Sequence, residues 1–420
     1  MGDEVTHSGV WGKYSYSLGQ FHFETDGFRE NNDLETNIYN VFVQSRLSPK
    51  VGLQAEYRHR EVDHGDLTLH FDPNDVNRFF RRNLRTDTVR VGAHYAPGPH
   101  SDFIVSAIYQ DEQEDQESRT RDDRFDSHGY IAEAQYLFSV PQFNAVVGGG
   151  HYRLNQEIRP PIGIPPIGEF DVPHTNTYVY SHIRYPAQLT WSLGVSLDAL
   201  DDGLIGEFNR LNPKFGMLWN LTPNTTLRLA AFRTLTRSLL TNQTIEPTQV
   251  AGFNQFFDDR AGTESKRYGI GLDHKFSSNL YSGLEISKRD LEVPLFLRRG
   301  LTLIDDWDEE LYRAYLNWTP YPSLAVSVGY QLEQFERENE NRFSDSFPRT
   351  ITHVAPVMLR FFHPSGFVSG VGATYVNQEV KFFTEAASGH GDFVLVDIGV
   401  AYRLPKRYGI ISLDIRNLLD

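Results

Sequence analysis

Apolar and polar residues alternate with a period of two along many short stretches of this 420-residue chain. Over residues 411–416 the odd-numbered positions carry isoleucine and leucine, whereas the even-numbered positions carry serine, aspartate and arginine. Residues 394–402 and 226–231 alternate in the same way. Because side chains of a β-strand point alternately to two faces, this period predicts strands that separate an apolar environment from a polar one.

The strand-like stretches, about nineteen from Val10 onward, are joined by short and long connections in turn. The short connections contain Pro, Gly, Ser or Asn, which favour tight turns because Pro fixes φ and Gly and Asn accept unusual backbone angles. They are Ser48–Lys50, Pro97–Pro99, Val140–Gln142, Tyr185–Ala187, Thr222–Asn224, Ser277–Asn279, Thr319–Pro322, His363–Gly366 and Leu404–Lys406.

The long connections are rich in charged residues, Gly and Asn. They are Asp26–Glu35, Asp63–Thr86, Asp111–Ser127, Glu157–Pro173, Thr236–Thr263, Val293–Asp308, Glu336–Phe347 and Gln378–Gly391. Since the chain reverses direction at each connection, this alternation collects the short turns on one rim of a sheet and the long loops on the other. Such asymmetry is typical of bacterial outer-membrane barrels.

The predicted fold class is therefore all-β: a large antiparallel up-and-down transmembrane β-barrel, with residues 1–420 forming a single domain. A soluble sandwich or propeller also contains many strands, but nothing in its construction requires alternating turn lengths. A soluble fold would also have to cover one face of every strand, and the sequence offers no helical segment for that purpose.

Composition narrows the function classes. Hydrophobic residues make up 40% of the chain and the mean hydropathy is −0.44, but no apolar run reaches the 18 or so residues of a spanning helix. The absence of cysteine excludes disulfides and thiolate metal sites. The formal charge of −15 argues against a nucleic-acid partner, because phosphate binding requires clustered Lys and Arg.

Aromatic residues form 13% of the chain, and many adjoin the short turns. Amphipathic rings prefer the boundary between lipid and water, so these positions predict an aromatic girdle on the turn side of the barrel. Ordinary aromatics within strands are the alternative interpretation. The girdle candidates are Tyr136, Phe138, Tyr185, Trp191, Trp219, Trp318, Tyr321, Phe361, Tyr402 and Tyr408.

Motifs that carry enzyme chemistry are missing. The sequence contains neither His-Glu-x-x-His nor Gly-x-Ser-x-Gly. His59 and His64 flank two carboxylates, and the acidic run at residues 111–117 could bind divalent cations, but solvated loops explain both patterns more simply. We therefore predict no catalytic, cofactor or metal site and no enzyme activity.

Two further features concern the interior of the barrel. Gly148–Gly150 lies inside a predicted strand, where the missing side chains indicate a kink or the close approach of an interior element. Arg228 and Arg416 lie on the polar faces of their strands and are expected to line the lumen.

Several short motifs resemble the barrel region of TonB-dependent receptors. Near the C-terminus, Asn417, Leu418, Leu419 and Asp420 are similar to an Asn-Leu-Phe-Asp-like element of that family. Upstream, Leu211, Asn212 and Pro213 resemble part of a mid-barrel strand pair, and Ile245, Glu246 and Pro247 resemble a motif of the following loop. The match is spread over most of the chain, although each motif is short.

The resemblance implies a 22-strand barrel of the outer membrane. Receptors of this family carry an N-terminal plug domain, which the few residues before Val10 are too short to form. We therefore expect only the barrel region, truncated at both ends. The implied function is uptake of a scarce small solute through long extracellular loops and a wide lumen.

The implied partners are outer-membrane lipid and lipopolysaccharide, with TonB-type energy coupling only where a plug is encoded upstream. A structural or export barrel attached to a periplasmic repeat domain is the second hypothesis. An outer-membrane enzyme is the third.

Overall fold

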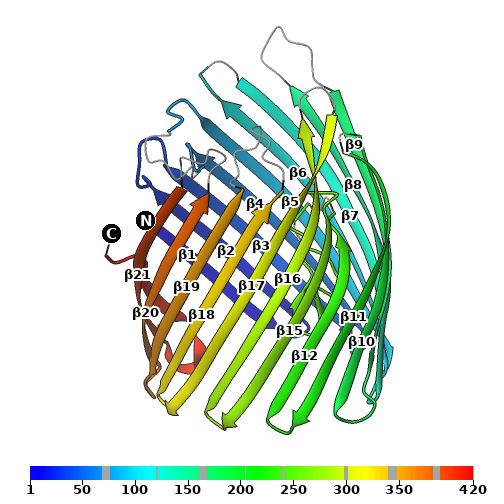
Figure 1. Cartoon of the computed structure of the whole chain (residues 1–420), viewed down its shortest axis with the longest axis vertical. Helices are drawn as coiled ribbons and strands as arrows, with labels where there is room; N and C mark the ends of the chain where they lie inside the picture. Colours follow the sequence, from blue (N-terminus) through cyan, green and yellow to red (C-terminus); the bar gives the residue numbers. More distant parts are fainter. Residues whose placement is uncertain are drawn as a thin grey trace.

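The computed structural model describes residues 1–68, 76–119, 122–159, 168–203, 205–237, 240–241, 243–297, 301–338, 348–381 and 388–419. Its main feature is one sheet of 20 strands that curves around an interior (Figure 1). A separate hairpin of two short strands lies between β12 and β15. Within the described residues, no helix is both long and apolar enough to cross a membrane.

The strands of the first half are β1 Gly2–Trp11, β2 Tyr14–Thr25, β3 Leu34–Ser48, β4 Val51–His64, β5 Arg81–Gly98, β6 Ser101–Glu117, β7 Asp122–Val140, β8 Phe143–Arg159, β9 Gly168–Ile183, β10 Leu189–Asp202 and β11 Gly206–Thr222. Those of the second half are β12 Thr225–Leu235, β13 Gln249–Val250, β14 Phe253–Asn254, β15 Glu264–Ser277, β16 Leu280–Leu297, β17 Leu301–Tyr321, β18 Leu324–Arg337, β19 Arg349–Phe362, β20 Phe367–Lys381, β21 Ser388–Arg403 and β22 Ile410–Ile415. A single 3-10 turn, η1 Pro405–Arg407, precedes β22.

Strands that follow one another in the chain pair antiparallel throughout the large sheet, with β12 pairing to β15 across the small hairpin. The predicted up-and-down barrel wall is confirmed. All nine predicted short turns lie on one rim, and a tenth at Gly12, with φ of 61°, joins β1 to β2. That turn accounts for the strand beyond the nineteen expected, because β1 precedes Val10 for most of its length.

Among the described residues, each of the two end strands of the sheet pairs with only one neighbouring strand. Strand β1 pairs with β2, and β22 pairs with β21 over Ile398–Arg403. The wall otherwise forms a continuous ladder from β1 to β22. The prediction of a single barrel domain within a 22-strand barrel remains a prediction.

Several strands continue far beyond the length that a membrane requires. Strands β17 and β7 have 21 and 19 residues, whereas about 9–11 tilted residues cross the hydrocarbon core. Four predicted loops are therefore wrong over more than half of their length. Most of Asp111–Ser127 belongs to β6 and β7, and most of Val293–Asp308 to β16 and β17. Slightly more than half of Glu157–Pro173 belongs to β8 and β9, and slightly more than half of Gln378–Gly391 to β20 and β21. Outside the membrane both faces of a strand meet water, so a strand can be polar on both faces and read as a loop.

The two faces of the wall differ in polarity as the period of two predicts. In β16, Leu284 and Ile286 are exposed on the outer face, whereas Glu285, Ser287 and Arg289 are buried on the inner face. Arg228 also points inward, where it forms ion pairs with Asp273 and Glu285. The buried residues of the molecule therefore form a largely polar core in the lumen rather than an apolar one.

Candidate functional site in the lumen

The connection between β12 and β15 folds into the lumen instead of extending outward. We call residues 236–263 the inward segment; it is described except at positions 238, 239 and 242. It contains the hairpin of β13 and β14, whose turn has positive φ at Ala251 (50°) and Gly252 (85°). Two consecutive left-handed residues are what a tight two-residue hairpin requires, and Gly accepts that conformation without strain.

Glycines of the wall provide space for this segment. Gly216 of β11 and Gly269 of β15 lie on the inner face, directly beneath the hairpin. A Cβ at Gly216 would lie 2.8 Å from Val250 Cγ1, and one at Gly269 would overlap the Phe253 ring. On the opposite side, a Cβ at Gly129 of β7 would lie 2.9 Å from Leu240 Cδ2. The hairpin can therefore pack directly on the wall, where Val250 and Phe253 form a buried cluster with Ala230 and Phe232.

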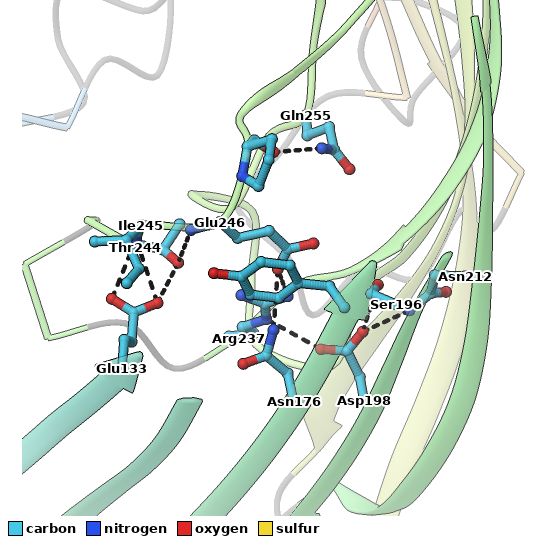
Figure 2. Close-up of polar contacts among 12 residues, drawn as sticks. Glu133, Asn176, Ser196, Asp198, Asn212, Arg237, Thr244, Ile245, Glu246 and Gln255 are labelled. Carbon is cyan, nitrogen blue, oxygen red and sulfur yellow. Dashed lines mark hydrogen bonds and ion pairs between the residues drawn. The ribbon is translucent and has the colours of Figure 1, made fainter. Parts of the chain in front are cut away.

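Arg237 is the centre of a buried ionic network between the segment and the wall (Figure 2). Its Nε donates to Asp198 Oδ1 of β10 at 3.0 Å, and its Nη2 donates to Glu246 of the same segment. The three side chains are 1%, 1% and 0% exposed. Burying a charge is costly unless it is paired and hydrogen-bonded, and this network pairs one cation with two carboxylates.

The two carboxylates are held by further polar groups of the wall. Asp198 accepts hydrogen bonds from Ser196 (3.1 Å) and from Asn212 Nδ2 (2.7 Å), and it lies 3.2 Å from His174 Nε2. Glu246 accepts from Asn176 (3.0 Å) and from the Tyr180 hydroxyl (2.6 Å). Since these groups belong to β9, β10 and β11, three neighbouring strands of the wall together form the binding site for the segment.

A second set of contacts holds the tip of the segment against β7 (Figure 2). Glu133 accepts hydrogen bonds from the Ile245 backbone N–H (3.1 Å), from the Thr244 hydroxyl and from the Tyr152 hydroxyl (2.8 Å). Gln135 donates to the Ile245 carbonyl at 2.6 Å. Since the Tyr152 hydroxyl contacts both Glu133 and Arg237, the two sets of contacts adjoin each other along strands β7 to β10.

Arginines of the wall also pack against phenylalanine rings of the segment. The guanidinium of Arg267 lies 4.9 Å from the Phe256 ring centre, and that of Arg289 lies 4.5 Å from it. Arg228 lies 5.1 Å from the Phe253 ring centre. Cation–π contacts of this kind gain strength where water is excluded.

The residues singled out by sequence meet this site only in part. Asn212 and Glu246 join the same network through Asp198 and Arg237, so two of the family-like motifs lie together in space. Leu211 is exposed on the outer face. Ile245 and Pro247 contact wall or segment residues through their backbone atoms, at Gln135 and Gln255.

The third motif lies elsewhere, after β22. The Asn417 N–H donates to Asp397 at 3.0 Å, and the Leu418 N–H donates to the Val396 carbonyl at 2.8 Å. Leu419 is exposed. Asp420 lies outside the described residues. A functional role for these motifs remains a prediction.

The girdle candidates occupy the rim of short turns. Tyr185, Trp219, Trp318, Tyr321, Phe361, Tyr402 and Tyr408 are exposed, and Tyr136, Phe138 and Trp191 are half-buried. The Trp191 indole N–H donates to the Tyr185 carbonyl at 3.1 Å. Their placement at a lipid boundary remains a prediction.

The predicted site residues do not include Arg237, Asp198 or Glu133. The alternation of a strand does not indicate which of its inward polar side chains will contact a loop that folds into the lumen. The Gly148–Gly150 run was the available signal. Cβ atoms at Gly148 and Gly150 would collide with the hydroxyls of Tyr178 and Tyr152, which lie over these glycines. Both tyrosines belong to the surroundings of the inward segment, so the expected close approach is made by side chains of the wall, Tyr152 from β8 itself and Tyr178 from the neighbouring β9.

Metal ligation has little support at this site. Among the residues that the structure describes, no three His, Asp or Glu side chains are arranged to hold a metal ion. His59 instead lies 2.8 Å from Asp87 and 3.4 Å from Glu61.

Space remains beside the segment. A cavity of about 1060 Å³ lies between the segment's tip at Gln243–Ile245 and the strands β2 to β7. A second cavity of about 200 Å³ is lined by β4, β5 and β6 and by the tip residues Leu240, Thr241 and Gln243. The segment therefore narrows the lumen, and the open part lies on the side of the early strands.

A long antiparallel wall with an apolar outside, a polar inside and turns of alternating length is the architecture of an outer-membrane β-barrel. Comparison with protein families agrees: residues 10–238 match the model described as TonB dependent receptor-like, beta-barrel. The chain belongs to this family and to the outer membrane. No curated protein sequence matches it.

Solved structures share the fold at low sequence identity. The siderophore receptor PiuA from Acinetobacter baumannii aligns with a TM-score of 0.72 and 12% identity, over 99% of this chain and 75% of its own. The ferripyoverdine receptor of the Pseudomonas aeruginosa outer membrane aligns at 0.71 and 12%, over 100% and 66%. The ferric-catecholate import receptor Fiu from E. coli K12 aligns at 0.68 and 13%, over 99% and 75%. The chain thus spans two thirds to three quarters of these receptors.

Proposed function

We propose that this chain forms the wall of an outer-membrane receptor that takes up a small solute, and that the inward segment restricts the route through the lumen. The observation that carries the proposal is the attachment of the segment inside a polar lumen, through Arg237 to Asp198 of β10 and through its backbone at Ile245 to Glu133 of β7. A barrel that served only as a structural anchor would not require a segment that occupies its lumen and is attached to the wall by buried ion pairs.

The names of the structural neighbours support uptake, since they describe receptors for iron-carrying solutes. The cavities beside the segment support a small solute, because about 1060 Å³ accommodates one. Energy coupling of the TonB type requires a plug domain, and we propose it only for a receptor in which such a domain accompanies this barrel.

Residues 1–420 form a single barrel domain in this proposal. The ten girdle aromatics lie at the lipid boundary, and outer-membrane lipid and lipopolysaccharide surround the apolar face. In this proposal the long loops determine which solute the receptor binds.

Passage can be tested with the refolded full chain in proteoliposomes. Swelling in a series of sugars of increasing size measures the width of the route. We expect the unaltered chain to admit small sugars slowly. A variant in which residues 243–258 are replaced by four Gly and Ser residues should admit larger sugars, with at least a two-fold higher rate.

A variant with Gly391→Val provides the control, because a Cβ at Gly391 meets nothing within 4 Å. It should swell at the rate of the unaltered chain. Equal rates for the unaltered and the segment-deleted chains, with both folded as judged by the shift of unheated samples on gels, would contradict the proposal.

A further inference from the structure

The second cavity is lined by three arginines from two neighbouring strands. Arg58 and Arg60 of β4 and Arg90 of β5 line it together with Thr86, Thr88 and Gln110. We propose that this cavity, here called the arginine pocket, binds the anionic group of a solute, a carboxylate or a phosphate. The inference rests on the proposed function and adds the chemical class of the solute.

The arginines of the pocket differ in their partners from other inward arginines. Arg228 pairs with Asp273, Arg237 with Asp198 and Arg289 with Glu309, whereas Arg267 donates hydrogen bonds to the Asn254 carbonyl and the Ser287 hydroxyl. Within the described part of the chain, Arg58 and Arg60 form neither an ion pair nor a hydrogen bond, although they are exposed to the pocket. In a chain with a formal charge of −15, two guanidinium groups on one strand without a carboxylate in direct contact stand out, and of the two Arg60 interacts electrostatically with Glu112.

The two glutamates of the pocket already have hydrogen-bond partners. Glu56 accepts a hydrogen bond from Asn40 at 2.9 Å and lies 3.4 Å from Arg90. Glu112 accepts from the Thr86 hydroxyl at 3.2 Å and from Gln110 at 3.4 Å. Three arginines face two glutamates, so the lining keeps an excess of one positive charge.

Two buried donors at the pocket lack hydrogen-bond partners among the described residues. The Thr241 hydroxyl and Arg90 Nε are both buried without a hydrogen bond among the described residues. An unsatisfied buried donor costs about 1–3 kcal/mol, so it is normally explained by a water, an ion or a ligand. Thr241 belongs to the inward segment, and Arg90 also donates to Gln243 of that segment.

An anion in the pocket would therefore contact the wall and the segment together. Guanidinium groups present a planar fork of N–H donors that matches the two oxygens of a carboxylate or phosphate. The Thr241 hydroxyl adds a neutral donor, whereas the Thr88 hydroxyl already donates to Gln110 at 3.4 Å. A solute bound in the arginine pocket would thus contact the inward segment, which restricts the route through the lumen.

Binding can be measured without passage, by isothermal titration calorimetry on the full chain in detergent. The probes are inorganic phosphate and citrate at constant ionic strength. We expect saturable binding of at least one probe, and at least a ten-fold loss of affinity in the double variant R58Q/R60Q. The double variant R58K/R60K should lose less, because it keeps the charges and loses only the forks.

Arg313→Gln is the matched control: it removes one positive charge from the lumen at β17, where Arg313 pairs with Glu285. It should bind the probes as the unaltered chain does. Absence of saturable binding, unchanged binding in R58Q/R60Q, or an equal loss in R313Q would each overturn the proposal. If the probes bind but sugars do not pass, only the uptake function is refuted. If sugars pass but the probes do not bind, only the arginine pocket is refuted.

Discussion

Arg237 determines how the inward segment is attached, because one guanidinium satisfies carboxylates on two different elements. The pairing differs from a surface ion pair in its burial. Removing one partner of a buried pair leaves the remaining charges without compensation, which costs about 3–5 kcal/mol. Surface pairs, by contrast, contribute little, since water already solvates both groups.

Arg237→Met should therefore lower the free energy of unfolding by about 3–5 kcal/mol and release the segment, because Asp198 and Glu246 stay buried without their cation. Urea unfolding in lipid vesicles measures the first effect, and limited proteolysis between residues 243 and 258 the second. Arg153→Met is the control, since Arg153 and its partner Asp171 are 47% and 42% exposed. Resistance of the Arg237→Met segment to protease would contradict the attachment.

Sequence could predict the direction of Arg228 and the polar face of its strand, because alternation alone sets both. It could not predict that Asn212 and Glu246 meet. The contact depends on a loop turning inward, and the composition of residues 236–263 is equally suited to a loop in water. Only their similarity to family motifs set these two residues apart.

Among the elements, the inward segment depends on its hairpin and on the glycines beneath it. Gly216 and Gly269 leave room where a side chain of the wall would otherwise stand, and side chains of the hairpin, Val250 and Phe253, occupy that space. The short turns could be predicted from Pro and Gly. The lengths of β6, β7, β16 and β17 could not, because strands that leave the membrane lose the alternation that identifies them.

Gly269→Leu should displace the hairpin, because the new side chain would overlap the Phe253 ring. Overpacking of this kind costs about 1–3 kcal/mol, and the hairpin can yield more easily than the wall. We expect faster cleavage of the segment by protease, with the β-sheet circular dichroism unchanged. Gly52→Leu, on the inner face with open space around it, should leave the cleavage rate unaltered.

At the scale of the whole molecule, the outer face separates a membrane belt from strand extensions in water. Ile286 lies on the outer face of β16, six residues from the turn, and Ile304 lies on the outer face of β17 near the loop rim. An arginine at the bilayer midplane costs about 2–4 kcal/mol, and the cost falls toward zero at the interface.

Ile286→Arg should accordingly reduce the free energy of insertion by about 2–4 kcal/mol, and Ile304→Arg by less than about 1 kcal/mol. Reversible folding into large vesicles in urea measures both. Similar losses at the two positions would mean that β17 does not leave the membrane where its length indicates.

The placement of charge around the inward segment has one more consequence. The segment contacts Asp198 and Glu133, and the pocket that it lines together with β4 holds Arg58 and Arg60. Displacement of the segment would remove its guanidinium and leave the carboxylates of β7 and β10 in the same lumen as the arginines of β4. The opened lumen would then hold a transverse electric field, and a zwitterion crossing it would travel with a defined orientation.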